Sequence, residues 1–173
     1  MPEEWINVGL LRAAKNGNAK NVGSALTPLI FAATAQVAAV LLDAVAEFDA
    51  ADDEGNTPLM CAANDDDLEF LDLLLQTGAD SQATTKSGRT ALMFAATAEI
   101  VGALVQAGVD VDATDQAGNS VLHRVAEDGE EAVVRVLLEI GAKANAKNRA
   151  GETALTLATT AGHQAVARVL EGG

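Results

Sequence analysis

The chain has 173 residues, of which 49% are hydrophobic and only 3% are aromatic. This length fits one ordinary domain or a short array of repeats, and the scarcity of aromatic rings predicts a core of small side chains. The formal net charge is −14, and 12 Asp or Glu residues lie between Lys20 and Lys86, where Lys and Arg are absent. Because phosphate backbones are bound by clustered cations, this pattern argues against nucleic-acid binding and favours a basic partner.

Targeting and cysteine signals in the sequence are few. No run of 18 apolar residues occurs, and the N-terminus MPEEWINVGLL lacks the basic start and apolar centre of a signal peptide. Cys61 is the single cysteine, so an intrachain disulfide and a thiolate metal cage are excluded. We expect a cytoplasmic protein that does not engage membranes.

One phrase recurs along the chain at regular intervals. In chain order it reads ALTPLIFAA from Ala25, GNTPLMCAA from Gly55, GRTALMFAA from Gly88, GNSVLHRVA from Gly118 and GETALTLAT from Gly151. The Thr or Ser of each copy follows the previous one by 30, 33, 30 and 33 residues. Periods of this length predict stacked supersecondary units rather than one globular core.

Each part of the recurring phrase has a structural role. The glycine suits a tight turn that needs positive φ, and the Thr or Ser two residues later suits a helix N-cap. Pro28 and Pro58 then occupy the first helical position, where a missing N–H costs nothing. The small residues that follow, such as Ala62 and Ala63, let a second helix pack closely against this first helix.

The second helix is clearest in DLEFLDLLLQTGAD. Leu68, Leu71, Leu74 and Leu75 fall at helical spacing on one face, and Gly78 predicts a left-handed end. Gly108 and Gly141 are expected to end the equivalent helices. Short polar links such as VDVDATDQAG follow, and they predict extended, hairpin-like fingers.

This turn–helix–helix–finger unit resembles the ankyrin repeat, with its 33-residue period and T-P-L-H-x-A signature. The resemblance implies an all-α repeat solenoid of stacked helix–turn–helix repeats with short hairpin-like fingers. We expect a single ankyrin repeat domain over 1–173, with a degenerate N-terminal cap at 1–22. The predicted repeats span about 23–52, 53–85, 86–115, 116–148 and 149–173.

Two departures from the pattern carry expectations of their own. The repeats at Thr27 and Thr90 lack three residues, which we place between their two helices, and both carry a Phe at the same register. Phe31 and Phe94 are expected to fill space at the tightened corner; the alternative is an aromatic anchor on the concave side. His123, in the family's histidine position, is expected to hydrogen-bond near the Ser120 cap.

The sequence offers few candidate catalytic or metal-binding residues. Cys61 lies inside a predicted first helix and is interpreted as a small core residue, since no base accompanies it. NDDDLEF at Asn64 lacks the spacing of a calcium loop, so Asp67 or a neighbour is expected to cap the second helix. We expect no catalytic residue, no cofactor, no metal site and no enzymatic activity.

Recognition of another protein is the remaining function. By the resemblance, partners bind the finger tips and the exposed face of the first helices. Thr97 also lies at a predicted first-helix end. The predicted contact residues are Asp53, Glu54, Asn56, Asn64, Asp65, Lys86, Arg89, Gln116, Asn119, Glu127, Asp128, Arg149 and Glu152.

The sequence therefore predicts a monomeric protein–protein interaction module that binds its partner through its concave face and finger tips. We expect the partner to present a basic segment that lies across the finger tips in the acidic half of this chain. The alternative is an inhibitor or regulator that blocks an enzyme or toxin by occupying its basic site. A zinc or calcium enzyme and a designed binder are further, less favoured hypotheses.

Overall fold

The computed structural model describes residue 49 and residues 51–172. This part forms seven α-helices and one 3₁₀ helix, and none of its residues belongs to a β-strand. The expected N-terminal cap, and with it nearly all of the first predicted repeat, including Thr27, Pro28 and Phe31, lies outside the described residues.

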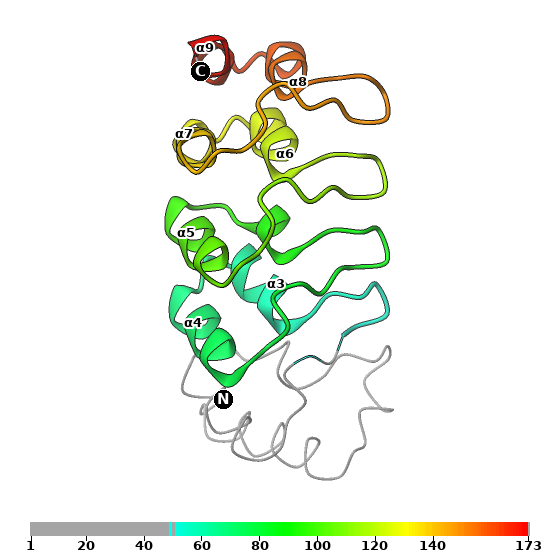
Figure 1. The fold of residues 1–173 in the computed structure, drawn as a ribbon, viewed down its shortest axis with the longest axis vertical. Coiled ribbons are helices and arrows are strands. Elements are labelled where there is room, and N and C mark those ends of the chain that lie inside the picture. Colours follow the sequence, from blue (N-terminus) through cyan, green and yellow to red (C-terminus); the bar gives the residue numbers. More distant parts are fainter. Residues whose placement is uncertain (1–48, 50, 173) are drawn as a thin grey trace, which may run out of the picture.

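The helices form two layers of a vertical stack, and a finger projects from each inner helix to the same side (Figure 1). The predicted all-α repeat solenoid is confirmed. The inner layer consists of α3 (Pro58–Asn64), η2 (Ala91–Phe94), α6 (Val121–Asp128) and α8 (Ala154–Ala161). The outer layer consists of α4 (Leu68–Thr77), α5 (Ala98–Gln106), α7 (Glu131–Glu139) and α9 (Gln164–Gly172).

The start of α3 follows the predicted capping chemistry. The Thr57 hydroxyl oxygen accepts a hydrogen bond from the Met60 N–H, and Pro58 occupies the first turn. Ala62 and Ala63 are almost fully buried, at 2% and 0% exposure. Small side chains at these positions let the neighbouring helices approach closely, which suits a core with few aromatic rings.

Helix α4 begins at the acidic corner and ends at a glycine. The Asp67 carboxylate accepts a hydrogen bond from the Phe70 N–H, so the predicted cap is confirmed. Gly78 ends the helix in the left-handed region at φ 90°. One expectation is wrong: Leu68 is 37% exposed, because it is the first residue of the helix and lies at the corner, while Phe70 is buried instead.

The three missing residues of the repeat at Thr90 are taken from its inner helix. Where α3 has seven residues, η2 has four, and both are followed by a three-residue connection before the outer helix. Our placement of the gap between the two helices is therefore wrong. Loss of one helical turn keeps the corner intact and leaves the inner layer shorter at this repeat.

The shortened helix uses different hydrogen bonds from α3. In η2 the Met93 N–H donates to the backbone carbonyl of Thr90 at 3.1 Å, as a 3₁₀ turn requires. The Thr90 hydroxyl is consequently buried without a partner among the described residues. At the other end, Nε of Arg124 from the next repeat donates to the Met93 carbonyl at 3.3 Å. A neighbouring side chain thus satisfies a carbonyl that the missing turn would have satisfied.

The fingers are closed turns that bond to one another along the stack. Within the second described finger the Thr85 N–H donates to the Arg89 carbonyl at 2.9 Å. Between fingers, backbone N–H groups donate to the preceding tip at 2.8–2.9 Å: Lys86 to Glu54, Gln116 to Ser87, and Arg149 to Ala117. This ladder fixes the spacing of the tips independently of the helices.

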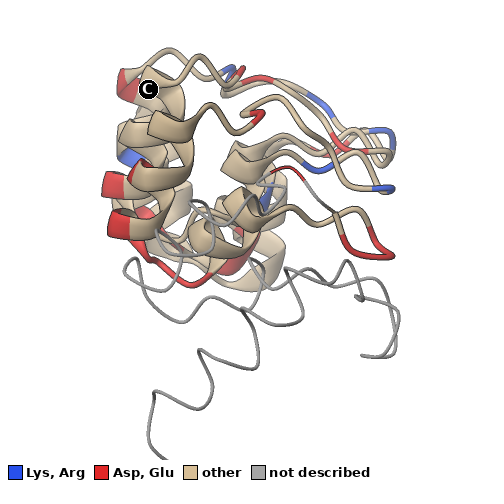
Figure 2. Ribbon diagram, turned by 90° about the horizontal axis from the view of Figure 1, so that it is seen from below, with Lys and Arg blue, Asp and Glu red and all other residues tan. Residues whose placement is uncertain are grey.

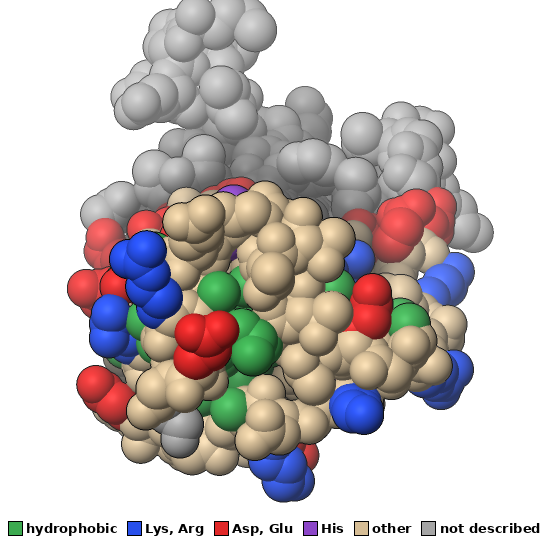
Figure 3. Space-filling model, turned by 90° about the horizontal axis from the view of Figure 1, so that it is seen from above, with side chains coloured by type: hydrophobic (Ala, Val, Ile, Leu, Met, Phe, Trp, Pro, Cys, Tyr) green, Lys and Arg blue, Asp and Glu red, His purple; other side chains and the backbone are tan. Residues whose placement is uncertain are grey.

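The C-terminal end of the stack is more polar than its interior. Thr156 and Thr159 are exposed at the registers where the preceding repeat buries His123 and Ala126. Seen from this end, hydrophobic side chains lie in the middle of the face with charged groups around them (Figure 3). Thr156 and Thr159 thus present hydroxyl groups to solvent at this face, where the preceding repeat has buried side chains.

Candidate functional site

Each finger tip carries two consecutive exposed residues, and the tips lie in a row along the stack. Asp53 and Glu54 are followed along the ladder by Lys86 with Ser87, Gln116 with Ala117, and Arg149 with Ala150, and all eight are exposed. Figure 2 shows the resulting charge order, with one acidic tip beside tips that carry cations. Five of the predicted contact residues therefore lie at solvent-facing positions that a partner can reach.

Behind the tips run two rows of half-buried side chains. The finger row lies at the base of the fingers, and the helix row lies on the inner helices four residues after each cap. The finger row consists of Asn56, Arg89, Asn119 and Glu152; the helix row consists of Cys61, Phe94, Arg124 and Leu157. We call the tips and these two rows together the inner face.

Most of the finger row is already engaged within the chain. The Asn56 amide donates to the Asp52 carboxylate at 2.8 Å. Burial alone would raise the pKa of Asp52, but this bond and the backbone N–H groups of Asn56, Glu54 and Gly55 together lower it. Asn148 donates both to the Asn119 side chain at 2.9 Å and to Glu152 at 3.1 Å. These predicted contact residues also hold the fingers in register.

The remaining predicted residues lie at the ends of inner helices. Asn64 ends α3, Asp65 follows it, Glu127 and Asp128 end α6, and all four are exposed. Between them, the shortened η2 contributes no matching pair. Thr97, expected at the end of a first helix, instead caps α5 by accepting from the Ile100 N–H. The row of helix ends is thus interrupted at the short repeat.

A hollow of about 230 Å³ opens on the inner face beside this interruption. Sequence reasoning placed neither Met60 nor Cys61 among the contact residues and gave Phe94 only as an alternative aromatic anchor. The shared register of Cys61 and Phe94, four residues after each cap, was the available signal, but the space between them depends on the lost helical turn. The hollow is lined by Asn56, Met60, Cys61, Asn64, Asp65 and Phe94.

Cys61 is half-buried at this hollow, so its interpretation as a core residue is wrong: α3 turns this position toward the inner face. Burial, and then the charges of Asp65 and Asp52, raise the pKa of its thiol to about 11. A thiol with a raised pKa carries little thiolate at neutral pH, and thiolate is the nucleophilic form. Cys61 is therefore a poor nucleophile here, chiefly because it is partly buried and secondly because Asp65 and Asp52 lie nearby.

Phe94 borders the same hollow and is also half-buried. Its ring packs against the core, and the Arg89 guanidinium carbon lies 5.8 Å from the ring centroid. The ring thus occupies part of the space left by the lost turn, and its remaining surface is open on the inner face.

His123 is a structural residue, as expected. It is 1% exposed, and its Nδ1 accepts a hydrogen bond from the Ser120 N–H at 3.2 Å. Its Nε2 lies 3.1 Å from the Ala146 carbonyl, and donation to that oxygen requires the proton on Nε2. His123 thus joins an inner helix to the following finger base.

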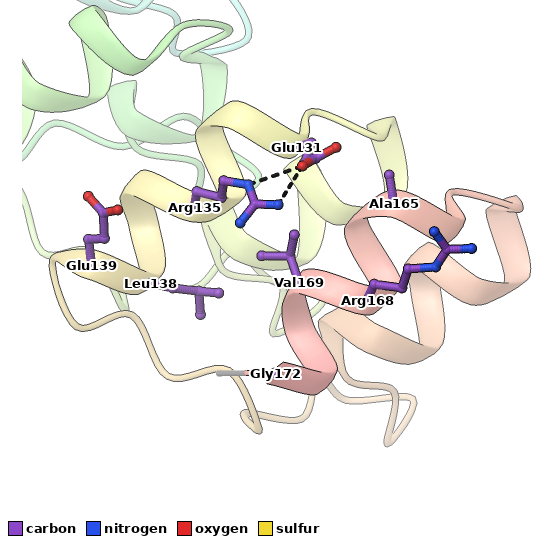
Figure 4. Close-up of a pocket in the computed structure, with 8 residues that line it drawn as sticks. All are labelled: Glu131, Arg135, Leu138, Glu139, Ala165, Arg168, Val169 and Gly172. Carbon is purple, nitrogen blue, oxygen red and sulfur yellow. Dashed lines mark hydrogen bonds and ion pairs between the residues drawn. The ribbon is translucent and has the colours of Figure 1, made fainter.

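A second hollow, of about 540 Å³, lies between outer helices α7 and α9. Leu138 and Val169 form part of its wall, and Arg135 points toward Glu131 while Arg168 points away from that pair (Figure 4). The Arg135–Glu131 ion pair measures 2.7 Å. Its lining charges balance, so it gives no preference for a basic or an acidic partner.

Other site types find little support among residues 49 and 51–172. This part contains no group of three or more His, Cys, Asp or Glu side chains that could hold a metal ion. None of its helices is both long and apolar enough to cross a membrane.

Comparison with protein families agrees with this architecture. A family model for ankyrin repeats, comprising three copies, matches residues 8–115 and 92–172. The chain belongs to the ankyrin repeat family. Ankyrin repeats are protein–protein interaction modules, so the general class of function is the binding of another protein.

Proposed function

We propose that this protein is a monomeric docking module that binds a partner protein through its inner face. The partner presents a basic segment to the first described finger and to the adjoining end of α3. The observation that carries this proposal is the acidic tip of Asp53 and Glu54, exposed at one end of the tip ladder within residues 51–172. The proposed role involves no catalysis by the module itself.

The electrostatics favour orientation of the partner along the ladder. Asp53 and Glu54 lie at one end, and Arg149 lies at the tip of the last finger. An extended partner segment with basic and acidic ends would therefore align in one direction. Exposed charges contribute mainly to association rate and specificity, while a few buried contacts hold the complex.

The test begins with capture of partners by the full chain from its native cell at low and high salt, followed by mass spectrometry. Association with the captured partner is then measured for the double variant Asp53→Lys, Glu54→Lys. We expect a slower association rate and a weaker salt dependence, because the steering charges are reversed. The dissociation rate should change less.

The matched control is Asp72→Lys, Glu139→Lys, which makes the same change in net charge on exposed outer-layer positions. This control should leave association unchanged. Equal effects of the two double variants, or no effect of the tip variant, would contradict the proposal. If the captured partner is an enzyme or toxin, its activity with and without the module separates simple docking from inhibition.

A further inference from the structure

The hollow between α3 and η2 combines three features that one kind of side chain would satisfy. Its walls include apolar surface from the half-buried Phe94, and Met60, which is only 1% exposed, lies behind them. Its rim carries the Asp65 carboxylate, and Asp52 adds a second negative charge nearby, since both carboxylates act on Cys61. An entering group must therefore be flat or slender, partly apolar, and positively charged.

The polar rim includes hydrogen-bond acceptors. The Asn56 amide nitrogen donates to Asp52 at 2.8 Å, and the Asn64 amide nitrogen donates to the Asp65 carboxylate at 3.0 Å. Each amide keeps its oxygen as an acceptor and its second N–H as a donor, and the Asp65 carboxylate adds acceptors only. Arginine carries five N–H donors and no acceptor, so its hydrogen-bonding capacity matches this rim.

Phe94 supplies the apolar complement to such a guest. A guanidinium group can lie on an aromatic face and still direct its N–H groups outward in its own plane. The chain's own Arg89 already lies 5.8 Å from the Phe94 ring centroid, so this ring accepts a guanidinium neighbour. Arg89 and Arg124, which donates to the carbonyl of the preceding residue Met93, both oppose a second guanidinium near this ring, so the guest's charge is attracted by the carboxylate side of the hollow, at Asp65.

We propose that this hollow receives an arginine side chain of the partner protein. This inference rests on the proposed function and names the partner group that anchors at the acidic end of the inner face. The arginine stem would lie along the ring of Phe94, and its N–H groups would donate to Asp65 and to the amide oxygens of Asn56 and Asn64.

The test uses short peptides and ¹⁵N-labelled full-length protein observed by NMR. Acetyl-Gly-Arg-Gly-amide is titrated beside the same peptide with citrulline, which has the arginine shape without its charge, and beside the lysine peptide. We expect saturable shifts of the Cys61, Asn64 and Phe94 amides with the arginine peptide. The citrulline and lysine peptides should bind more weakly, since citrulline lacks the charge and lysine lacks the planar fork.

Three variants test whether the hollow binds a positively charged group. Asp65→Asn should weaken arginine-peptide binding about tenfold, the factor of one charge-assisted hydrogen bond. Arg89→Gln should strengthen binding severalfold, because it removes an opposing cation. The control Asp72→Asn removes an exposed carboxylate from outer helix α4, outside the hollow and outside the predicted contact residues, and should leave binding unchanged.

A second readout is the reaction of Cys61 with an alkylating reagent in alkaline buffer. The arginine peptide should protect the thiol, and the citrulline peptide should not. Absence of arginine-peptide shifts, equal binding of the citrulline or lysine peptide, or tighter binding by Asp65→Asn would overturn the inference.

The two proposals fail separately. If the peptide does not bind while the captured partner still depends on Asp53 and Glu54, the arginine hollow is wrong and the docking module stands. If the peptide binds as expected while the captured partner ignores the tip charges, the hollow stands and the proposed docking mode is wrong.

Discussion

The hydroxyl of Thr97 donates a hydrogen bond to the Asp66 carboxylate at 2.6 Å and so joins the corners of two consecutive repeats. Asp66 holds a left-handed conformation, at φ 57°, at the register where the repeat beginning at Ser120 has Gly129. Aspartate tolerates this region better than most residues that carry a side chain. The corner of the long repeat thus uses one residue both as its turn and as its link to the short repeat.

Substitution at Asp66 separates these two roles. Asp66→Ala should destabilise the protein by about 1–2 kcal/mol, because it loses the hydrogen bond and places an unsuitable residue in the left-handed region. Asp66→Gly should cost less, since glycine adopts that conformation freely. Urea unfolding followed by circular dichroism measures both. Alanine and glycine variants of equal stability would show that the backbone conformation at Asp66 carries no cost.

The tip ladder can be tested by paired glycine substitutions. Gly55 and Gly151 hold similar conformations, at φ 87° and 82°, but a Cβ at Gly55 would lie 3.0 Å from the Lys86 nitrogen, whereas a Cβ at Gly151 has no neighbour within 4 Å among the described residues. Both alanine variants lose about 1 kcal/mol to conformation, and Gly55→Ala should lose about 1 kcal/mol more. Its Lys86 amide should also exchange hydrogen faster. Indistinguishable variants would show that the ladder does not constrain the tips.

The helix caps of the long and short repeats should respond differently to the same change. Thr57→Val removes a working cap and should cost about 1 kcal/mol of unfolding free energy. Thr90→Val removes a buried hydroxyl without a partner among the described residues, and should be neutral or stabilising. Thermal unfolding of the two variants measures the contrast. A comparable loss in both would mean that η2 is capped in the same way as α3.

The reactivity of Cys61 follows from its environment. Its pKa of about 11, against an ordinary value of 9.0, means about a hundredfold less thiolate at neutral pH. Alkylation by iodoacetamide should therefore be much slower in the folded chain than in urea, and its rate should keep rising through alkaline pH. Asp65→Asn should speed the reaction by removing one of the carboxylate charges. A rate that levels off near the ordinary thiol pKa would contradict the negative character of the hollow.

The sequence predicts the repeat architecture well because each element is specified locally. The cap at Thr57, the left-handed end at Gly78 and the cap at Asp67 each depend on residues within one turn of the helix end, and the structure has all three. The recurring phrase also placed eight residues at exposed tips, whereas Asn56, Arg89, Asn119 and Glu152, expected at the tips as well, lie half-buried at the finger bases. Local chemistry of this kind recurs in the long repeats, and the short repeat at Thr90 departs from it.

The hollow could not be derived in the same way. A three-residue deletion can shorten a helix or a corner, and only the packing against α3 and α6 shows that η2 absorbs it. The hollow then joins side chains from a finger, a full helix and a shortened helix, whose relative positions depend on that choice. Cys61 was misjudged for the same reason, since periodicity gives a face of α3 but not what covers it.

The central claim is that a partner protein docks on the inner face. Hydrogen exchange of the full chain, alone and with the captured partner, tests it most directly. We predict slower exchange at the tips around Asp53 and Lys86, in α3 around Cys61 and in η2 around Phe94. Exchange in α7 and α9 should change little. Protection confined to the outer hollow between α7 and α9, with the finger tips exchanging as in the free chain, would contradict the account.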